Sequence, residues 1–161
     1  MFIFRKYLYI CMIFCGLSYQ PTFANESKAQ STSEIQNTLI IQNAFELWKN
    51  GQGSVFDLLS EHVKWTVAGY SPVSGTYKTK QEFIDQAVKP INSFFAKPLK
   101  PTVNHIIAQG NNVVVLWDGV AQAKDGRLYK NNYAWHFVME NKKAIEVTAY
   151  LDTFALMKLM D

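Results

Sequence analysis

The sequence of 161 residues contains only two cysteines, Cys11 and Cys15, and both lie within its first 24 residues. The rest of the chain therefore has no thiol for a disulfide, a nucleophile or a thiolate-bound metal. Its stability must come from the burial of apolar side chains. A chain of this length can bury on the order of two-thirds of its extended surface.

The sequence also lacks a long hydrophobic run that would predict a membrane anchor. Residues 7–17 are apolar and follow Arg5 and Lys6, but the uncharged stretch ends near Tyr19, short of the roughly 20 residues that span a bilayer. A basic start, a short apolar stretch and a small residue at Ala24 are typical of a signal peptide. We predict cleavage after Ala24 and export to the periplasm or the extracellular space.

Two alternatives to a cleaved signal remain open at this point. The first is a retained anchor, which the length of the apolar stretch disfavours. The second is a lipoprotein, which needs a small residue before the modified cysteine, whereas Phe14 precedes Cys15.

Beyond the leader, the chain has no excess of charge of either sign. Without Arg5 and Lys6, the 16 cationic residues fall to 14, against 13 acidic ones. A nucleic-acid partner is therefore not expected, because it would require a basic surface.

Motifs for metals and cofactors are absent as well. The histidines His62, His105 and His136 are not spaced as in H-x-x-x-H or H-E-x-x-H, so we predict no metal site. The sequence has no G-x-S-x-G, phosphate loop or dinucleotide fingerprint, and we therefore expect no cofactor.

The sequence predicts one domain at residues 34–161, after a polar, flexible linker at residues 25–33. Ser31 and Glu34 have the spacing of a capping box, which indicates the start of a helix. Asn50 and Gly51 are typical of a helix end. Helical patterns cover residues 31–50, 53–60 and 80–95, the last with a kink or early stop expected at Pro90.

Most of the remaining sequence alternates with the period of a strand. A strand is expected over residues 62–67, followed by a loop at 68–75. Four further strands are expected over residues 102–109, 112–123, 128–139 and 144–153, with short turns that make them antiparallel neighbours. A helical turn is expected at 154–160. Helices followed by a meander predict an α+β domain with a curved sheet.

Several short pieces of the sequence have a familiar order and spacing. They are Trp65 with Gly69, Pro72 and Ser74–Tyr77; His105–Gly110 followed by Val113–Trp117; Asp125-Gly126 with Tyr129, Asn131, Tyr133 and Phe137; and Ile145 with Tyr150–Thr153. Together they resemble the SnoaL-like branch of the nuclear transport factor 2-like superfamily, which includes ketosteroid isomerase. The resemblance covers about residues 34–158.

This resemblance implies a cone in which about three helices pack into a strongly curved, mainly antiparallel sheet. It also implies a ligand pocket at the open end and a homodimer formed through sheet faces. The sequence departs from the family pattern at Thr79, where glycine is frequent, and at Ala149, where an acidic residue is frequent.

Asp152 is the first candidate catalytic residue. In the polyketide cyclases that the chain resembles, an aspartate of the last strand acts as the base, and burial would raise the pKa of such a carboxyl to a useful value. The alternative is that Asp152 caps the helical turn that follows, since aspartate is a common N-cap residue.

Asn131 and Tyr133 are candidate donors to a ligand carbonyl or an enolate, because alternation places them on one strand face with Trp135 and Phe137. The alternative is that these rings belong to the core. The high aromatic content favours an apolar or aromatic ligand. The candidate ligand-binding residues are Trp65, Tyr77, Trp117, Trp135 and His105.

Two mechanisms of the resembling enzymes lack their residues in this sequence. The segment 65–68, where a ketosteroid isomerase would have its base, contains no acid. The epoxide hydrolases of the superfamily use an Asp-Arg-Asp arrangement, but the sole arginine after the leader is Arg127, in the Asp125-Gly126 turn. We therefore expect an exported protein that binds a small apolar or aromatic molecule without turnover. The alternative is a cyclase- or isomerase-type enzyme that uses Asp152 to abstract a proton next to a carbonyl.

Overall fold

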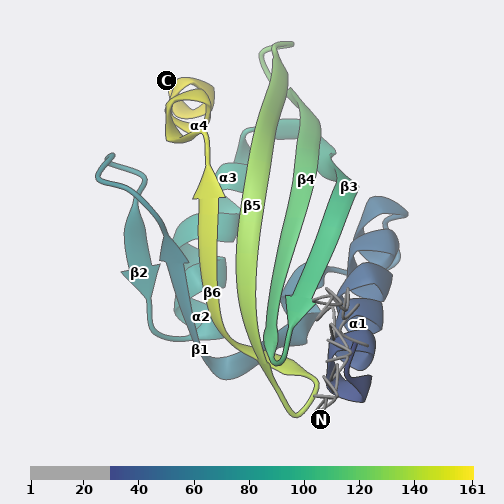
Figure 1. Cartoon of the computed structure of the whole chain (residues 1–161). Helices are drawn as coiled ribbons and strands as arrows, with labels where there is room; N and C mark the ends of the chain where they lie inside the picture. The colour runs from purple at the N-terminus through teal and green to yellow at the C-terminus, as the bar shows by residue number, and fades with distance from the viewer. Residues whose placement is uncertain (1–29) are drawn as a thin grey trace, which may run out of the picture.

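The computed structural model describes residues 30–161, so the expected signal peptide lies outside the described residues. A curved sheet forms the body of the domain, with α1 beside β3 and with α2 and α3 behind the sheet (Figure 1). The helical elements are α1 (Thr32–Lys49), the 3₁₀ turn η1 (Val55–Leu58), α2 (Lys80–Phe83), the π-helix η2 (Ile84–Val88), α3 (Lys89–Ser93) and α4 (Thr153–Met160). The strands are β1 (Leu59–Val67), β2 (Gly75–Tyr77), β3 (Phe95–Gln109), β4 (Asn112–Ala123), β5 (Leu128–Glu140) and β6 (Lys143–Leu151).

The six strands form one mixed sheet in the order β2-β1-β6-β5-β4-β3. Strands β3 to β6 pair as antiparallel neighbours, as their short turns predict. Strand β1 pairs in parallel with β6 and antiparallel with β2. The expected α+β class is therefore confirmed. The loop expected at residues 68–75 ends at Gly75, where the short strand β2 begins.

The first helix begins where its capping residues predict. The Ser31 hydroxyl accepts a hydrogen bond from the Glu34 amide, and the Glu34 carboxylate accepts one from the Ser31 amide. Because α1 starts at Thr32, the end of the segment expected to be a linker is already helical. Ile41, Ala44 and Phe45 are the buried apolar side chains of this helix.

The helix that covers the inner face of the sheet runs through Pro90 without stopping. Proline has no amide hydrogen to donate to the carbonyl four residues earlier. Just before it, the Lys89 amide donates to the Ile84 carbonyl, five residues back, which is the hydrogen bond of a π-helix. The wide turn η2 accommodates Pro90, so α2, η2 and α3 form one continuous helical segment in place of the early stop.

Alternate residues of the central strands point into the space enclosed by the curved sheet. In β5 the side chains of Tyr133, Trp135 and Phe137 are buried on this inner face. They pack with residues of α1, α2, β1 and β4 in the larger of two core clusters. The smaller cluster joins the far end of β5, at Tyr129, to α4. No helix of the described residues is long and apolar enough to cross a bilayer.

Candidate functional site

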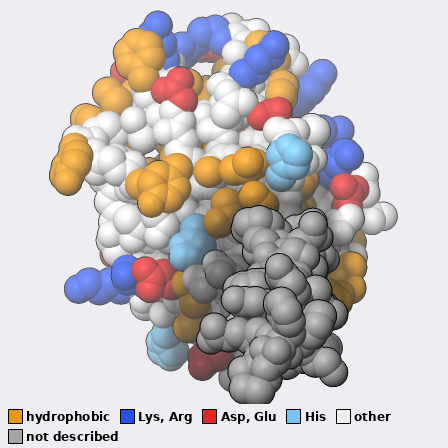
Figure 2. Space-filling model, viewed as in Figure 1, with side chains coloured by type: hydrophobic (Ala, Val, Ile, Leu, Met, Phe, Trp, Pro, Cys, Tyr) orange, Lys and Arg blue, Asp and Glu red, His pale blue; other side chains and the backbone are white. Residues whose placement is uncertain are grey.

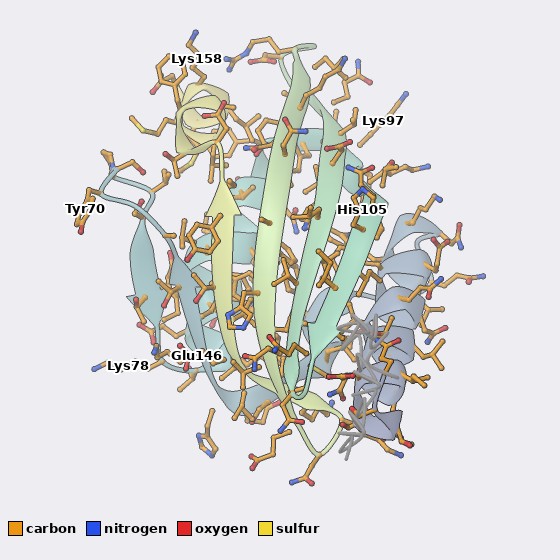
Figure 3. The ribbon with its side chains drawn as sticks, viewed as in Figure 1. Tyr70, Lys78, Lys97, His105, Glu146 and Lys158 are labelled. Atoms are coloured by element: carbon orange, nitrogen blue, oxygen red, sulfur yellow. The ribbon has the colours of Figure 1, made fainter. Side chains whose placement is uncertain are left out.

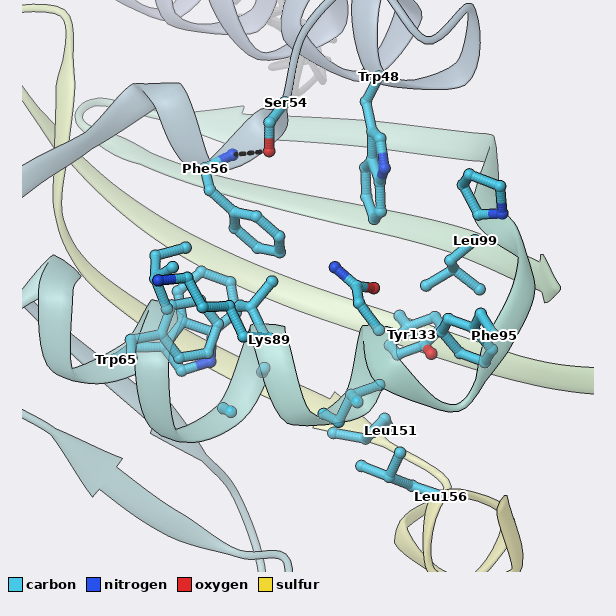
Figure 4. Close-up of a pocket in the computed structure, with 18 of the residues that line it drawn as sticks. Trp48, Ser54, Phe56, Trp65, Lys89, Phe95, Leu99, Tyr133, Leu151 and Leu156 are labelled. Atoms are coloured by element: carbon cyan, nitrogen blue, oxygen red, sulfur yellow. Dashed lines mark hydrogen bonds between the residues drawn. The ribbon is translucent and has the colours of Figure 1, made fainter. Parts of the chain in front are cut away.

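A cavity of about 820 Å³ lies between the inner face of the sheet and the helical segment α2–α3 (Figure 4). The end of α1, the segment 53–57 and Leu156 of α4 complete its wall. This volume lies within the range of small-molecule sites, roughly 300–1,000 Å³. The cavity therefore has the size of a small-molecule site.

One side of the cavity is built from aromatic rings of four different elements. Trp65 of β1 stacks on Phe83 of α2 with their ring centroids 4.0 Å apart. Phe56 meets the edges of both rings and also packs against Trp48 of α1, at 5.8 Å. All four residues line the cavity. Stacking and edge contacts between such rings favour a flat, apolar occupant.

The other side contains Tyr133, whose ring stacks on Trp117 at 3.9 Å between centroids. Trp135 packs edge-on against Trp117 and Trp65, which connects the two sides. Tyr133 lines the cavity, whereas Trp117 and Trp135 lie behind it as core rings.

Tyr133 belongs to a buried chain of hydrogen bonds. The Tyr133 and Tyr129 hydroxyl oxygens are 2.9 Å apart, and the Asn131 amide nitrogen donates to the Tyr129 hydroxyl at 2.8 Å. Asn131 also bonds the backbone of Asp152 twice: its nitrogen donates to the Asp152 carbonyl and its oxygen accepts from the Asp152 amide. The side chain of Asn131 therefore extends the pairing of β5 with β6 beyond the last backbone pair, Tyr133 with Leu151.

Burial makes both tyrosines hold their protons. It raises the pKa of Tyr133 far above its ordinary value, and the neighbouring Tyr129 adds to the rise. Burial also raises the pKa of Tyr129, against an opposing effect of its hydrogen bonds with Tyr133 and Asn131. Near neutral pH the pair can donate hydrogen bonds but does not supply a phenolate base.

The charged residues of the cavity wall stand at its rim and have partners there. The Lys89 ammonium lies 2.7 Å from the Asp85 carboxylate, and Lys80 lies 3.6 Å from Glu61. Asp57 accepts a hydrogen bond from the Ser54 amide, in the cap of the turn η1. None of these groups forms the paired acid and base that proton transfer would need.

Asp152 does not line the cavity. Its exposed carboxylate is the N-cap of α4 and accepts hydrogen bonds from the Phe154 and Ala155 amides, at 2.9 and 3.1 Å. It continues the face of β6 that carries Tyr150, whereas the cavity is lined by Ala149 and Leu151 of the opposite face. The geometry therefore favours the capping alternative.

The structure separates the five residues expected to bind the ligand. Trp65 lines the cavity, and Trp117 and Trp135 support its wall from behind. Tyr77 is half-buried and packs against Phe83, outside the lining. His105 is exposed on the outer face of the sheet, because β3 pairs it with Leu116 rather than with the inward-facing Trp117 (Figure 3).

Other lining residues were not singled out from the sequence. Trp48 and Phe83 lie in predicted helices on apolar faces, but a helical pattern does not distinguish a cavity wall from a filled core. Tyr129 follows the Asp125-Gly126 turn and points inward with Asn131, a signal that strand alternation carries. Among the described residues, no group of three or more His, Cys, Asp or Glu side chains could hold a metal ion.

Comparisons with known proteins rest on structure. The sequence matches no protein-family model, and no curated protein matches it. A protein from Jannaschia sp. CCS1, described as a SnoaL-like polyketide cyclase, superposes with a TM-score of 0.65 at 17% identity, over 81% of this chain and 94% of that one. An NTF2-like protein of unknown function from Burkholderia pseudomallei K96243 gives 0.64 at 22% identity, over 76% and 95%.

A third structure, that of TerC co-crystallized with polyporic acid, superposes with a TM-score of 0.63 at 17% identity, over 77% of this chain and 97% of that one. These likenesses cover nearly the whole of the known proteins. The chain therefore has the nuclear transport factor 2-like fold, in the form shared with SnoaL-like proteins.

Proposed function

We propose that the domain binds a small apolar or aromatic molecule in the cavity, without turnover. The observation that carries this proposal is the character of the wall: mainly aromatic and aliphatic side chains enclose about 820 Å³, and the Tyr129–Tyr133 hydroxyl pair lies in its buried part. Burial of a ligand's apolar surface there would supply roughly 25 cal/mol per Å². The known structure that contains polyporic acid supports such an occupant for this fold.

The enzyme alternative is a SnoaL-like cyclase or isomerase that uses Asp152 as its base. The likeness to a SnoaL-like polyketide cyclase favours it. Its weakness is the position of Asp152, whose carboxylate is occupied by two backbone amides outside the cavity wall. Since no carboxylate of the described residues lies in the buried part of the wall, binding without turnover has the better support.

The test is a fluorescence titration with 1-anilinonaphthalene-8-sulfonate, an anionic probe whose aromatic rings fluoresce when they enter an apolar site. Ala87 lines the cavity, and the neighbouring Gln86 is exposed on the same helical segment. We expect Ala87→Phe to weaken probe binding at least tenfold by filling the cavity, and Gln86→Phe to leave it unchanged. Equal probe affinity of both variants and the unchanged protein would contradict the proposal. Native mass spectrometry of the purified protein would then give the mass of any ligand bound in the cell.

We also propose that the protein is exported and that residues 1–24 are removed. The support is the sequence alone: Arg5 and Lys6, the short apolar stretch and the small residue Ala24. N-terminal sequencing of secreted protein is expected to begin at Asn25. An intact Met1 on the exported protein would refute cleavage.

The outer face of the sheet is the proposed contact with a second copy of the chain. Its side chains include the exposed Ile107, Val120 and Tyr150 and the half-buried Leu116. Figure 2 shows hydrophobic and histidine side chains together on this face. Exposed apolar residues that share one face are typical of interfaces between proteins.

A further inference from the structure

Helix α4 is apolar on nearly every side, although it lies at the surface of the domain. Thr153 and Lys158 are its only polar residues. Leu156 and Leu159 are buried against the end of the sheet, whereas Phe154 is 64% exposed. A helix that is apolar all round is normally enclosed by other structure. The outward face of α4 therefore lacks a partner within residues 30–161.

A groove of about 240 Å³ runs between α4 and the start of β5. The apolar side chains that line it include Leu128, which is 60% exposed, and Ala155. Three cationic side chains line it as well, those of Arg127, Lys130 and Lys158. Apolar and cationic groups are thus mixed on one surface beside the helix.

Cationic residues gather around this groove. We call residues 94–101, 119–131 and 152–161 the α4 end, because the core cluster around α4 joins these three segments. Its cationic residues are Lys97, Lys100, Lys124, Arg127, Lys130 and Lys158. They are six of the thirteen cationic residues at 30–161, whereas only three of the twelve acidic ones lie in these segments. Figure 2 shows the Lys and Arg side chains together at this end.

The lysines of the α4 end have no acidic partner among the described residues. Four lysines elsewhere form ion pairs of 2.7 to 3.9 Å, namely Lys49, Lys64, Lys80 and Lys89. At the α4 end only Arg127 does so, with Asp125. The Asp152 carboxylate is occupied by the cap of α4. The unpaired cations are complementary to an anionic surface, whereas a second copy of the chain would bring the same charges to this face.

We propose that the α4 end docks reversibly on an anionic lipid surface. Phe154 and Leu128 enter the boundary between head groups and acyl chains, and the lysines contact the lipid phosphates. The Lys158 ammonium lies 4.7 Å from the centroid of the Phe154 ring. Its flexible side chain can therefore reach a phosphate while the ring lies deeper. Exposed apolar side chains combined with basic ones on a helix are typical of binding to a lipid interface. This inference does not depend on what occupies the cavity.

The test is co-sedimentation with vesicles of phosphatidylcholine alone and with vesicles in which about a third of the lipid is phosphatidylglycerol. We expect binding to the anionic vesicles only, and weaker binding as salt screens the charges. The double variant Lys130→Gln/Lys158→Gln should bind about 10- to 30-fold more weakly, at roughly fivefold for each cation. The control Lys78→Gln/Lys142→Gln removes the same charge from exposed residues at the opposite end of the molecule and should keep the affinity (Figure 3).

The apolar part of the contact has its own variant. Phe154→Gln should weaken binding severalfold at high salt as well, because apolar insertion is not screened. Should this variant not fold, the two lysine pairs still decide. All forms share one N-terminus, so lipid binding by residues 1–24 would not distinguish them.

Three results would overturn the proposal. The first is no binding of the unchanged protein to anionic vesicles, and the second is binding to both kinds of vesicle with equal affinity. The third is an equal loss of binding in the two double variants, which would remove the α4 end as the docking surface. If lipid binding is absent and Phe154→Gln converts a dimer to a monomer in sedimentation velocity, a second copy covers this face instead.

Discussion

The ring of Tyr133 lies against the backbone of Gly119, so closely that a Cβ atom at residue 119 would be 2.8 Å from Cε2 of the ring. The same Cβ would be 3.1 Å from side-chain atoms of Leu99 and Trp117. Gly119 lies on β4 two residues after Trp117, whose ring stacks on Tyr133, and it pairs with Asn131 of β5. The position of the tyrosine at the cavity therefore depends on a residue without a side chain on the adjacent strand.

Gly119→Ala is accordingly expected to displace the Tyr133 ring. Overpacking of this kind costs about 1–3 kcal/mol in the free energy of unfolding, and ligand affinity should fall with it. Urea unfolding and the probe titration measure the two effects. Gly75→Ala is the matched control, because its Cβ would meet no atom within 4 Å. Equal stability of the two variants would show that the ring has room to move.

Asn131→Ala should destabilise the protein more than a typical polar substitution. It removes the bonds to the Asp152 amide and carbonyl and to the Tyr129 hydroxyl, and it leaves buried groups without partners. The expected loss in unfolding free energy is about 2–3 kcal/mol. Asn132→Ala, on the exposed face of the same strand, removes a bond to Asp118 and should cost much less. Similar losses for both variants would contradict the central role of Asn131.

Substitutions of Asp152 distinguish a cap from a catalytic base. Asp152→Ala should lower the unfolding free energy by about 1 kcal/mol, whereas Asp152→Asn, which can still cap, should cost little. Neither change should alter ligand affinity, because the carboxylate is outside the cavity wall. Turnover of a cyclisable substrate by the unchanged protein that disappears in Asp152→Asn would establish the enzyme alternative.

Strand alternation allowed part of the site to be predicted from sequence. It placed Asn131, Tyr133 and Trp135 on one face of β5, and all three are buried there. Alternation could not indicate which face of β6 points into the cavity. Asp152 continues the outer face, with Tyr150. Irregular pairing between Val103 and His105 likewise turns His105 outward, and such a bulge leaves no clear mark in a single sequence.

The prolines explain why other boundaries differ from the prediction. The sequence predicts a strand only from residue 102, after Pro98 and Pro101, but β3 is an edge strand that begins at Phe95. Proline is tolerated there because one side of an edge strand has no ladder partner. Pro90 is tolerated in its helix because the π-helix η2 precedes it. The effect of a proline thus depends on neighbours that are distant in the sequence.

Stability is expected to fall in strongly alkaline solution. The pKa of Tyr133 is raised by burial, whereas in the unfolded chain the hydroxyl titrates near 10.0. Above that pH the unfolded state loses the proton and the folded state keeps it, so the free energy of unfolding decreases as pH rises. Tyr133→Phe should reduce this decrease between pH 9 and about 11. Tyr70→Phe, fully exposed, should not, and an unchanged slope in Tyr133→Phe would argue against a buried, protonated hydroxyl.

The proposed contact between two copies predicts a dimer through the outer face of the sheet. Leu116 lies in the middle of this face, next to His105 on β3 and Ala134 on β5. Leu116→Lys would place a charge in the apolar centre of the contact, and desolvation of that charge should convert the dimer to a monomer in sedimentation velocity. Lys78→Glu, at an exposed residue in the connection between β2 and α2, serves as a control for a change in surface charge. If the wild-type protein is monomeric at tens of micromolar, the proposed contact is refuted. If the dimer persists in Leu116→Lys, the contact between the two copies lies elsewhere on the molecule.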